Sequence, residues 1–330
     1  MAQQNDSIYY SLQKILSHNK IMNFIIGNRG GGKSFEAKRW AISGFLKNKK
    51  QFVYVRRYKT ELVDIKNFFS DIAFMFPNVE FLVEGGRFYI NGQVAGYYMP
   101  LSTAQQHKSN SYPEVDKIIF DEFILDKGKN TYLKGEVQVF LDLFETIARM
   151  RDDVRAVLIA NAISVINPYF TYFKIYPRAN DKFIVRGETV TEIYKSEAFI
   201  EKKKQTRFGK LIDGSQYGDY AIENMFLRDN KSFIEKMHGK STVYVGMKYM
   251  GEDYAIYVNE PTDCLFFIKG KVPDSFTTFV MTTEDHMPNL LVLNKGSIVF
   301  QRLKQAYEFG KIRFDNINSK AAFYEIMQII

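Results

Sequence analysis

Short apolar runs alternate with amphipathic segments along the first half of the chain. The apolar runs, each typical of a buried strand, lie at residues 21–26, 51–57, 116–120 and 156–162. The segments with apolar side chains at helical spacing lie at residues 34–48, 60–76 and 136–151. Strand and helix therefore alternate from about residue 21 to residue 162, and this order predicts an α/β domain with a mostly parallel sheet.

Turn residues and short apolar runs mark the remaining segments. Residues 79–101 predict a β-hairpin or meander, with turns at Gly85-Gly86 and Asn91-Gly92. Residues 206–220 carry several glycines without periodicity, which is typical of a connecting segment. From residue 231 onward, short strands precede a helical tail, so we expect a second, smaller α+β domain. The predicted divisions are a domain at 1–197, a linker or connecting subdomain at 198–230 and a domain at 231–330.

Composition narrows the class of protein. The 330 residues suffice for two domains, and the single cysteine, Cys264, cannot form an internal disulfide. No histidine or cysteine cluster has the spacing of a zinc site. There is neither a signal-peptide pattern nor an apolar stretch of about 18 residues, so we expect a cytosolic protein without a membrane partner. The net charge of +8 is compatible with a polyanionic partner such as nucleic acid, or with a merely basic protein.

A glycine-rich loop joins the first predicted strand to the first predicted helix. Its sequence, GNRGGGKS, satisfies the pattern GxxxxGK[ST], in which backbone N–H groups surround the phosphates of a nucleotide. Lys33 would reach the β- and γ-phosphates, and the hydroxyl of Ser34 would ligate Mg²⁺. A chance match is the alternative, and the strand and helix flanks argue against it. The predicted ATP-binding residues are Gly27, Asn28, Arg29, Gly30, Gly31, Gly32, Lys33 and Ser34.

Polar residues follow two of the other predicted strands. Asp121 and Glu122 end the strand at 116–120, at the sheet edge where the glycine-rich loop also lies, so Asp121 can hold Mg²⁺ and Glu122 can activate the attacking water. Alone, such a pair of acids is often a solvated turn. Asn161 ends the next strand and would sense the γ-phosphate, or would simply begin a loop; the two interpretations weigh equally.

Arginines could complete the site within one chain or between two chains. Arg29 lies in the loop itself and could touch the phosphates in cis. Arg149, Arg151 and Arg155 lie between the helix at 136–151 and the strand that ends at Asn161. An arginine that reaches a neighbouring subunit's site would stabilise the transition state, and Arg149 is the first candidate. The alternative, a basic helix end that compensates the helix dipole, suits Arg151 and Arg155.

Several longer strings resemble one family. With GNRGGGKSFEAKRW, VYVRRYKTEL, GGRFYINGQVAGYYMPLS, KSNSYP, IIFDEF, NAISVINPYF and TRFGKLIDGSQYG, the chain resembles the genome-packaging ATPases of phi29-like phages from about Ile8 to its end. These ATPases belong to the additional-strand P-loop division, related to large terminases and FtsK-like translocases. The resemblance implies a homopentameric ring at the portal, or connector, of a procapsid, which drives double-stranded DNA inward. It implies a host-cytoplasmic protein that is absent from the mature virion, and it makes a structural RNA a further candidate partner.

The same resemblance assigns roles that the residues alone do not. Arg149 matches the family's trans-acting arginine and Lys108 its trans-acting lysine, although by itself Lys108 is only a loop lysine. The C-terminal domain resembles the RNase H-like nuclease of large terminases. Met247 and Lys248 stand where that nuclease has a metal-binding aspartate, so we expect no nuclease activity. A displaced metal site at nearby carboxylates is the minority alternative; these are Glu252, Asp253 and Asp263.

Candidate DNA contacts are lysines and arginines beside aromatic residues. They are Arg56, Lys59, Lys202, Lys203, Lys204 and Arg207, and they would meet phosphates without reading sequence. A solvated helix face is the alternative for 202–204, and a subunit interface is the alternative for Arg56, Arg57 and Lys59.

These observations together predict an Mg-ATP-driven translocase that packages viral double-stranded DNA. The runner-up is a P-loop phosphotransferase, a kinase acting on a small molecule, which would hydrolyse ATP without responding to DNA. A third hypothesis is a portal- or scaffold-binding protein with a relict nucleotide site. The intact set of Lys33, Ser34, Asp121 and Glu122 argues against that third hypothesis.

Overall fold

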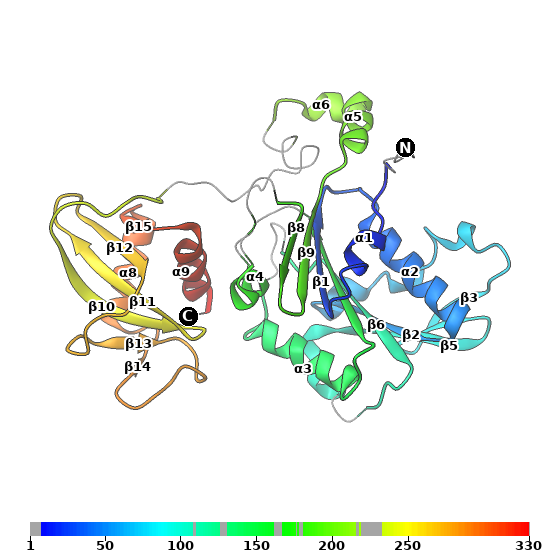
Figure 1. The fold of residues 1–330 in the computed structure, drawn as a ribbon, viewed down its shortest axis with the longest axis horizontal. Helices are drawn as coiled ribbons and strands as arrows, with labels where there is room; N and C mark the ends of the chain where they lie inside the picture. Colours follow the sequence, from blue (N-terminus) through cyan, green and yellow to red (C-terminus); the bar gives the residue numbers. More distant parts are fainter. Residues whose placement is uncertain are drawn as a thin grey trace. The chain divides into compact units, whose positions relative to one another are not determined.

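The chain divides into two compact units, each with its own sheet. The computed structural model describes residues 8–107, 110–125, 131–161, 167–175, 177, 181–215, 218 and 233–329. The first unit comprises Met1–Val165 and Pro177–Arg228, and the second comprises Ile166–Tyr176 and Asp229–Ile330 (Figure 1). In the described part of the chain, no helix is both long enough and apolar enough to cross a bilayer.

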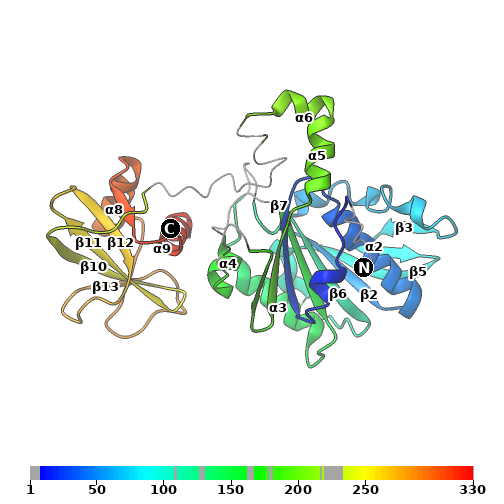
Figure 2. The ribbon, with the colours of Figure 1, turned by 45° about the horizontal axis from the view of Figure 1, so that its top comes forward.

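A nine-stranded sheet forms the centre of the first unit (Figure 2). Its strands are β1 Met22–Gly27, β2 Gln51–Arg56, β3 Phe81–Glu84, β4 Arg87–Ile90, β5 Gln93–Pro100, β6 Val115–Asp121, β7 Arg155–Asn161, β8 Phe183–Arg186 and β9 Thr189–Tyr194. Their spatial order is β3-β4-β5-β2-β6-β7-β1-β9-β8, and the six strands from β5 to β9 run parallel. The predicted mostly parallel sheet is confirmed. Strand β7 lies between β1 and β6, which is the additional-strand arrangement that the resemblance implied.

Helices cover both faces of this sheet. They are α1 Gln13–Leu16, α2 Lys33–Asn48 and α3 Glu136–Ala148. Helices α5 Glu197–Gln205 and α6 Arg207–Ile212 lie beyond the end of the sheet (Figure 1 and Figure 2). The unit also contains the 3-10 turns η1 Lys59–Leu62, η2 Ile65–Asn67, η3 Ala73–Met75 and η4 Leu101–His107. Ile119 of β6 belongs to the same core cluster as Phe45 of α2. Its neighbour Phe120 stacks on Phe140 of α3, with ring centroids 5.6 Å apart. Because successive side chains of a strand point to opposite faces, α2 and α3 cover opposite sides of β6.

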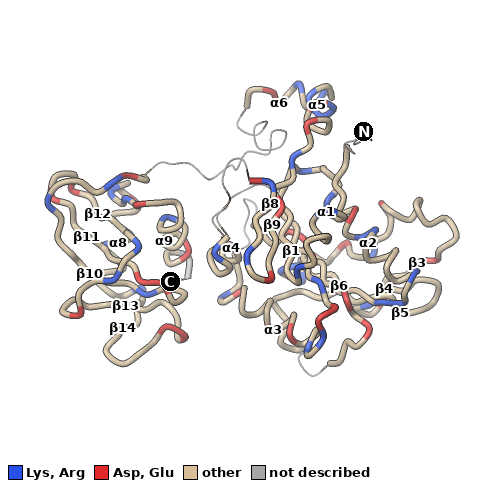
Figure 3. Tube along the Cα trace, in the orientation of Figure 1, with Lys and Arg blue, Asp and Glu red and all other residues tan. Residues whose placement is uncertain are grey.

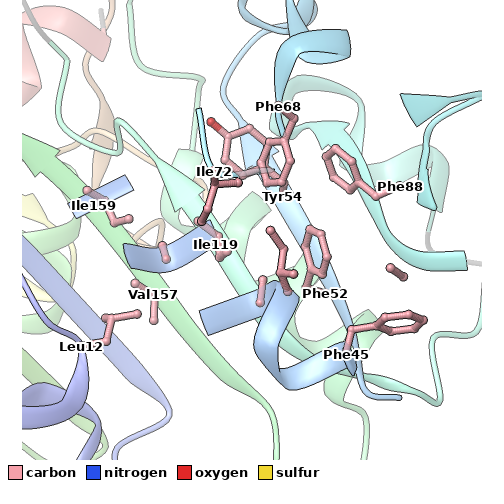
Figure 4. Packing of buried hydrophobic residues seen from close by; sticks show 14 of the residues in the cluster. Leu12, Phe45, Phe52, Tyr54, Phe68, Ile72, Phe88, Ile119, Val157 and Ile159 are labelled. Atoms are coloured by element: carbon pink, nitrogen blue, oxygen red, sulfur yellow. The ribbon is translucent and has the colours of Figure 1, made fainter. Parts of the chain in front are cut away.

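Aromatic rings fill the core beside β2 and β4 (Figure 4). The ring of Phe88 lies 4.3 Å from that of Phe68 and 5.1 Å from that of Phe52, measured between centroids. Phe69 and Tyr98 contact the same ring at 5.5 and 5.4 Å. This cluster joins the antiparallel extension of the sheet to its parallel part.

The helix predicted over residues 60–76 is wrong, because this segment forms the separate 3-10 turns η1, η2 and η3. Polar side chains compete here with helical hydrogen bonding: the hydroxyl of Ser70 donates to the carbonyl of Asn67. Lys38 of α2 also donates to the carbonyl of Phe68. The segment still buries Phe68, so its apolar periodicity reflects core packing without a continuous helix.

The second unit contains a six-stranded sheet of mixed direction. Its elements are β10 Ser241–Tyr249, β11 Glu252–Asn259, β12 Cys264–Lys269, β13 Thr278–Val280, β14 Leu291–Val292, β15 Ile312–Phe314 and the helices α4 Pro168–Phe173, α8 Ile298–Glu308 and α9 Ile317–Ile329. The order is β14-β13-β10-β11-β12-β15, with β11 antiparallel to both neighbours and β13 parallel to β10. This order from β12 to β14 is that of an RNase H-like sheet, as predicted. Phe267 and Phe323 pack together in its core, with centroids 5.5 Å apart.

The structure places two segments in units that differ from the predicted domain limits. Helix α4 follows β7 in the sequence yet groups with the second unit, where the hydroxyl of Thr171 donates to Glu325 of α9 at 2.8 Å. Lys174 likewise pairs with Glu252 at 2.6 Å. Helices α5 and α6, within the predicted linker, group with the first unit.

The aromatic core predicts the effect of one truncation. We expect Phe88→Ala to lower the free energy of unfolding of the first unit by about 3–5 kcal/mol, because it removes a buried ring and leaves a cavity. Urea denaturation followed by the fluorescence of the single tryptophan, Trp40 in α2, reports on this unit. Leu82→Ala, on the adjacent strand β3 and 54% exposed, is the control and should change stability by less than about 0.5 kcal/mol. Equal losses in both variants would contradict the proposed core.

Candidate functional site

The loop between β1 and α2 has the backbone geometry that phosphate binding requires. Gly30 and Gly32 have φ of 82° and 86°, values that a residue with a side chain rarely adopts. Gly32 is the N-cap of α2, whose N-terminal N–H groups attract anions. The loop, the ends of β6 and β7 and Glu122 line one cavity of about 300 Å³.

Lys33 is the first residue of α2, and its side chain reaches back to the start of the phosphate loop. Its Nζ donates to the carbonyls of Gly27 and Asn28 at 2.9 and 2.7 Å and lies 3.4 Å from Oδ1 of Asn161. Burial lowers the pKa of Lys33 to about 8, opposed by the charge of Asp121 and reinforced by that of Lys203. Strand β7 therefore places Asn161 beside the phosphate loop, the position that a γ-phosphate sensor would need.

Asp121 ends β6 beside the start of α2. The hydroxyl of Ser34 donates to its Oδ1 at 3.0 Å, and the hydroxyl of Tyr54 donates to its Oδ2 at 3.1 Å. Tyr54 comes from β2 and was missed in the sequence, where it reads as one more core residue of an apolar strand. Burial and the neighbouring carboxylate hold the pKa of Tyr54 well above its usual value, so it stays a donor. Carboxylate and hydroxyl oxygens at this spacing are the donor set that suits Mg²⁺.

Glu122 turns out of the strand at a left-handed backbone position, with φ of 63°. One of its carboxylate oxygens accepts from Arg56 at 2.5 Å, and the side chain is 55% exposed. Burial alone would lower the pKa of Arg56, but Glu122 reverses this and raises it. Arg56, predicted to bind DNA, therefore has an acidic partner at the edge of the phosphate cavity.

Arg57 is a structural residue. It is 1% exposed and donates to both carboxylate oxygens of Glu136, at 2.8 and 2.9 Å, and to the carbonyl of Phe123 at 2.7 Å. It thus joins the end of β2, the segment after Asp121 and the first turn of α3. A DNA or interface role for Arg57 is wrong, because no partner can reach its guanidinium.

The three candidate arginines after α3 have different hydrogen-bond partners. Arg151 donates to backbone carbonyls, including those of Val115 and Ile147 at 2.6 and 2.8 Å, and so joins the end of α3 to the start of β6. Arg155 donates to Oδ1 of Asn19 at 2.7 Å. Arg149 is exposed at the end of α3 and donates to the carbonyl of Asn110 at 3.3 Å.

The other residues predicted to contact DNA, and the predicted trans-acting lysine, lie in separate segments of the chain. Lys59 is exposed in η1, and Lys202, Lys204 and Arg207 are exposed on α5 and α6. Lys203 differs, because its Nζ donates to the carbonyl of Arg29 at 2.9 Å. Lys108 lies outside the described residues.

Two of the three carboxylates of the alternative metal site, Glu252 and Asp263, are paired with lysines. Glu252 pairs with Lys174 and Lys269, at 2.6 and 2.8 Å, and Asp263 pairs with Lys311. Among the residues that the structure describes, no group of three or more histidines, cysteines and carboxylates could hold a metal ion.

Comparison with known proteins identifies the family. The sequence profile "Podovirus DNA encapsidation protein (Gp16)" matches residues 4–330. The chain belongs to this family. It is 39% identical to the DNA packaging protein of Bacillus phage phi29 over 324 residues, which are 98% of both chains.

Solved structures agree with this family assignment. The chain matches a protein of the phi29 genome packaging motor assembly with a TM-score of 0.76 at 39% identity, over 98% of this chain and 99% of that one. The crystal structure of the N-terminal domain of the DNA packaging ATPase from phi29 matches with a TM-score of 0.56 at 47% identity, over 58% of this chain and all of that one. The family assignment confirms the resemblance and favours DNA packaging over a small-molecule phosphotransferase.

A segment before β1 braces the phosphate loop, which the sequence did not reveal. The backbone N–H of Tyr10 donates to the carbonyl of Gly31 at 2.9 Å, and its hydroxyl donates to Glu192 of β9 at 2.8 Å. The backbone N–H of Leu12 donates to Glu36 of α2 at 3.2 Å. Burial raises the pKa of Glu192 to about 7, although the Tyr10 hydroxyl opposes the shift.

This carboxyl predicts a pH-dependent stability. Between its usual pKa of 4.5 and about 7, the folded chain binds a proton at Glu192 that the unfolded chain releases, so stability falls as pH rises through this range. We expect Glu192→Gln to remove this slope and to stabilise the first unit at pH 8 by up to about 3 kcal/mol. Urea denaturation at pH 5 to 8, with Trp40 fluorescence, tests it. Glu188→Gln, an exposed carboxyl in the same hairpin, is the control; an unchanged slope in Glu192→Gln would refute the assignment.

Proposed function

We propose that this chain is the ATPase of a viral DNA packaging motor, which couples ATP hydrolysis to the movement of double-stranded DNA into a procapsid. The observation that carries the proposal is the convergence of Lys33, Ser34, Asp121 and Glu122 on one cavity. Full-length similarity to DNA packaging proteins supports the choice of DNA as the translocated polymer.

The residues of the cavity divide the chemistry among them. The loop amides and Lys33 bind the β- and γ-phosphates, while Asp121 and Ser34 hold Mg²⁺. When bound, Mg²⁺ neutralises charge on the phosphate oxygens. Glu122 takes the proton of the attacking water, and Asn161, 3.4 Å from Lys33 Nζ, lies where it can contact the γ-phosphate. Arg29 lines the same cavity and can contact phosphate in cis.

A ring arrangement accounts for the exposed Arg149. Helix α3 begins at Glu136, which Arg57 joins to the carbonyl of Glu122. The helix then runs for 13 residues, roughly 20 Å, before Arg149. Its own Glu122 therefore lies about a helix length away, which argues against a role for Arg149 in its own site and supports the proposal that it serves the site of a neighbouring subunit. A homopentamer at the portal provides that neighbour, with Lys108 as a second trans-acting residue and a structural RNA as a further candidate partner.

The second unit serves docking or DNA contact without cutting DNA. Met247 and Lys248 occupy β10 where a nuclease needs a carboxylate, and Glu252 is neutralised by two lysines. DNA contact in the first unit remains assigned to exposed cations, of which Lys59, Lys204 and Arg207 are accessible.

ATP hydrolysis with and without double-stranded DNA, across a range of salt, tests the function. We expect stimulation by DNA that fades as salt rises, because phosphate contacts release counterions. Glu122→Gln should bind ATP normally and lose hydrolysis by roughly a hundredfold or more, as expected for loss of a general base. Asp116→Asn, a carboxyl near the opposite end of β6, is the matched control. DNA-independent hydrolysis would instead favour a phosphotransferase.

Mixing subunits tests the trans role of Arg149. Arg149→Ala should bind ATP as a subunit and yet lose DNA-stimulated hydrolysis in the assembled motor, because its neighbour's site is incomplete. A Lys33→Ala subunit, which cannot bind the phosphates, should restore part of the activity when mixed with Arg149→Ala, since it supplies an intact arginine. Absence of any restoration in mixed rings would contradict the trans assignment.

A further inference from the structure

An almost fully exposed methionine follows the candidate trans-acting arginine. Met150 is 98% exposed, although methionine is among the residue types most often buried. It comes directly after Arg149, so the two Cα atoms lie about 3.8 Å apart. Charged residues of both signs surround it in the sequence, including Arg151 and Asp152 (Figure 3). An apolar side chain within a charged rim is the composition of the centre of a protein interface.

The turn that carries Met150 is held on both sides. Arg149 has φ of 50° and ψ of −118°, a combination that a residue with a side chain rarely adopts. Its backbone N–H donates to the carbonyl of Glu145 at 2.7 Å. The side chain of Arg151 donates to four backbone carbonyls, which are those of Tyr112, Pro113, Val115 and Ile147. These bonds fix the backbone before and after Met150, so the turn presents its side chain outward from a rigid base.

An exposed apolar patch lies at the edge of the phosphate cavity. We define this cavity-edge patch as Phe35, Phe74 and Met75. Phe35, in the first turn of α2, lines the phosphate cavity. Phe74 of η3 stacks on Phe35 with ring centroids 6.2 Å apart, yet it is 75% exposed, and Met75 is 43% exposed. Lys38 of α2 pairs with Asp71 at 2.9 Å, which holds the segment before η3 against the same helix.

The exposed methionine and the cavity-edge patch complement one another only between two copies of the chain. Met150 and Phe74 are both largely exposed, so neither covers the other within one chain. An Arg149 that enters a neighbour's phosphate cavity brings Met150 to the wall that Phe35 forms. Charge agrees with this approach, because the exposed carboxylate of Glu122 lines the same cavity. The two surfaces differ from each other, and such heterologous contacts generate rings.

We propose that Met150 of one subunit docks on the cavity-edge patch of the next subunit and thereby positions Arg149 in that subunit's site. This inference rests on the proposed ring ATPase and deepens it by naming the surface that receives the neighbour. Met150 touches no nucleotide and acts through Arg149, so it is a positioning residue. Methionine suits this role, because its flexible thioether adapts to aromatic rings and packs favourably against them.

Disulfide crosslinking in the motor assembled with double-stranded DNA tests the contact directly. We expect Met150→Cys subunits mixed with Phe74→Cys subunits to form disulfide-linked dimers on oxidation, because docked side chains bring the two Cβ atoms within disulfide range. Val185→Cys is the matched control for Phe74→Cys. It is 47% exposed on β8, at the opposite edge of the sheet from β3, and should give no dimers. The native Cys264 is buried and should not compete.

A double-mutant cycle tests whether the contact positions Arg149. Met150→Ala and Phe74→Ala should each lower kcat of DNA-stimulated hydrolysis by about two- to tenfold, the loss expected for one methionine–aromatic contact. The double variant should lose no more than either single variant, because both remove the same contact. Met150→Leu should restore most of kcat. Met150→Ala should leave KM for ATP unchanged, since the phosphates are bound by the other subunit's own loop.

Failure of this contact and failure of the proposed function give different results. Equal crosslinking to Val185→Cys and Phe74→Cys, or no crosslinking to either, would overturn the docking. Additive losses in the double variant would overturn the positioning role. Either result leaves the trans role of Arg149 standing if mixed rings of Arg149→Ala and Lys33→Ala subunits regain activity. An unaltered chain without DNA-stimulated hydrolysis would instead refute the proposed function itself.

Discussion

The hydrogen bond between Ser34 and Asp121 is the contact on which the organisation of the candidate site depends. It joins the first turn of α2 to the end of β6, two strands away from β1 in the sheet. Parallel register makes this possible: Gly27 of β1 is paired with Asn161 of β7, and Ile159 of β7 with Asp121 of β6. A slip of one residue would turn these side chains to the opposite face. The order β2-β6-β7-β1 is therefore as much a part of the site as the loop itself.

A buried ion pair stabilises the segment that follows Asp121. Arg57 and Glu136 are both almost completely buried, and their mutual ion pair is completed by backbone carbonyls and by the N–H of Leu133. Removing one member of such a pair leaves an uncompensated buried charge, which typically costs about 3–5 kcal/mol. The turn that carries Glu122 is thereby anchored to β2 and α3. The strained backbone of Glu122 can persist because its surroundings fix it.

The sequence predicted those parts of the site that one continuous segment determines. The strand, glycine loop and helix around Lys33, and the acids after β6, follow local rules of periodicity and edge chemistry. The partners of these residues could not be predicted, because they depend on strand pairing between distant segments. Tyr54 reads as an ordinary core residue until β2 is placed beside β6, and Tyr10 shows no signal until its segment lies against the loop. The helix predicted over residues 60–76 was wrong for another reason: 3-10 turns that pack on the core can show the same apolar spacing as a helix.

Because of helix α4, segments of the two units alternate along the chain. The chain leaves the first unit after β7, contributes α4 to the second, returns to build β8 and β9, and leaves again after α6. Three crossings therefore connect the units, so no single peptide cleavage releases either one with all of its own residues. A fragment starting at residue 229 would lose the Thr171 hydroxyl that bonds to the buried Glu325, and a fragment ending at residue 228 would carry α4 without α9. Dissection of this protein thus alters a protonatable interior position, whose pKa burial raises to about 7, as well as dividing the chain.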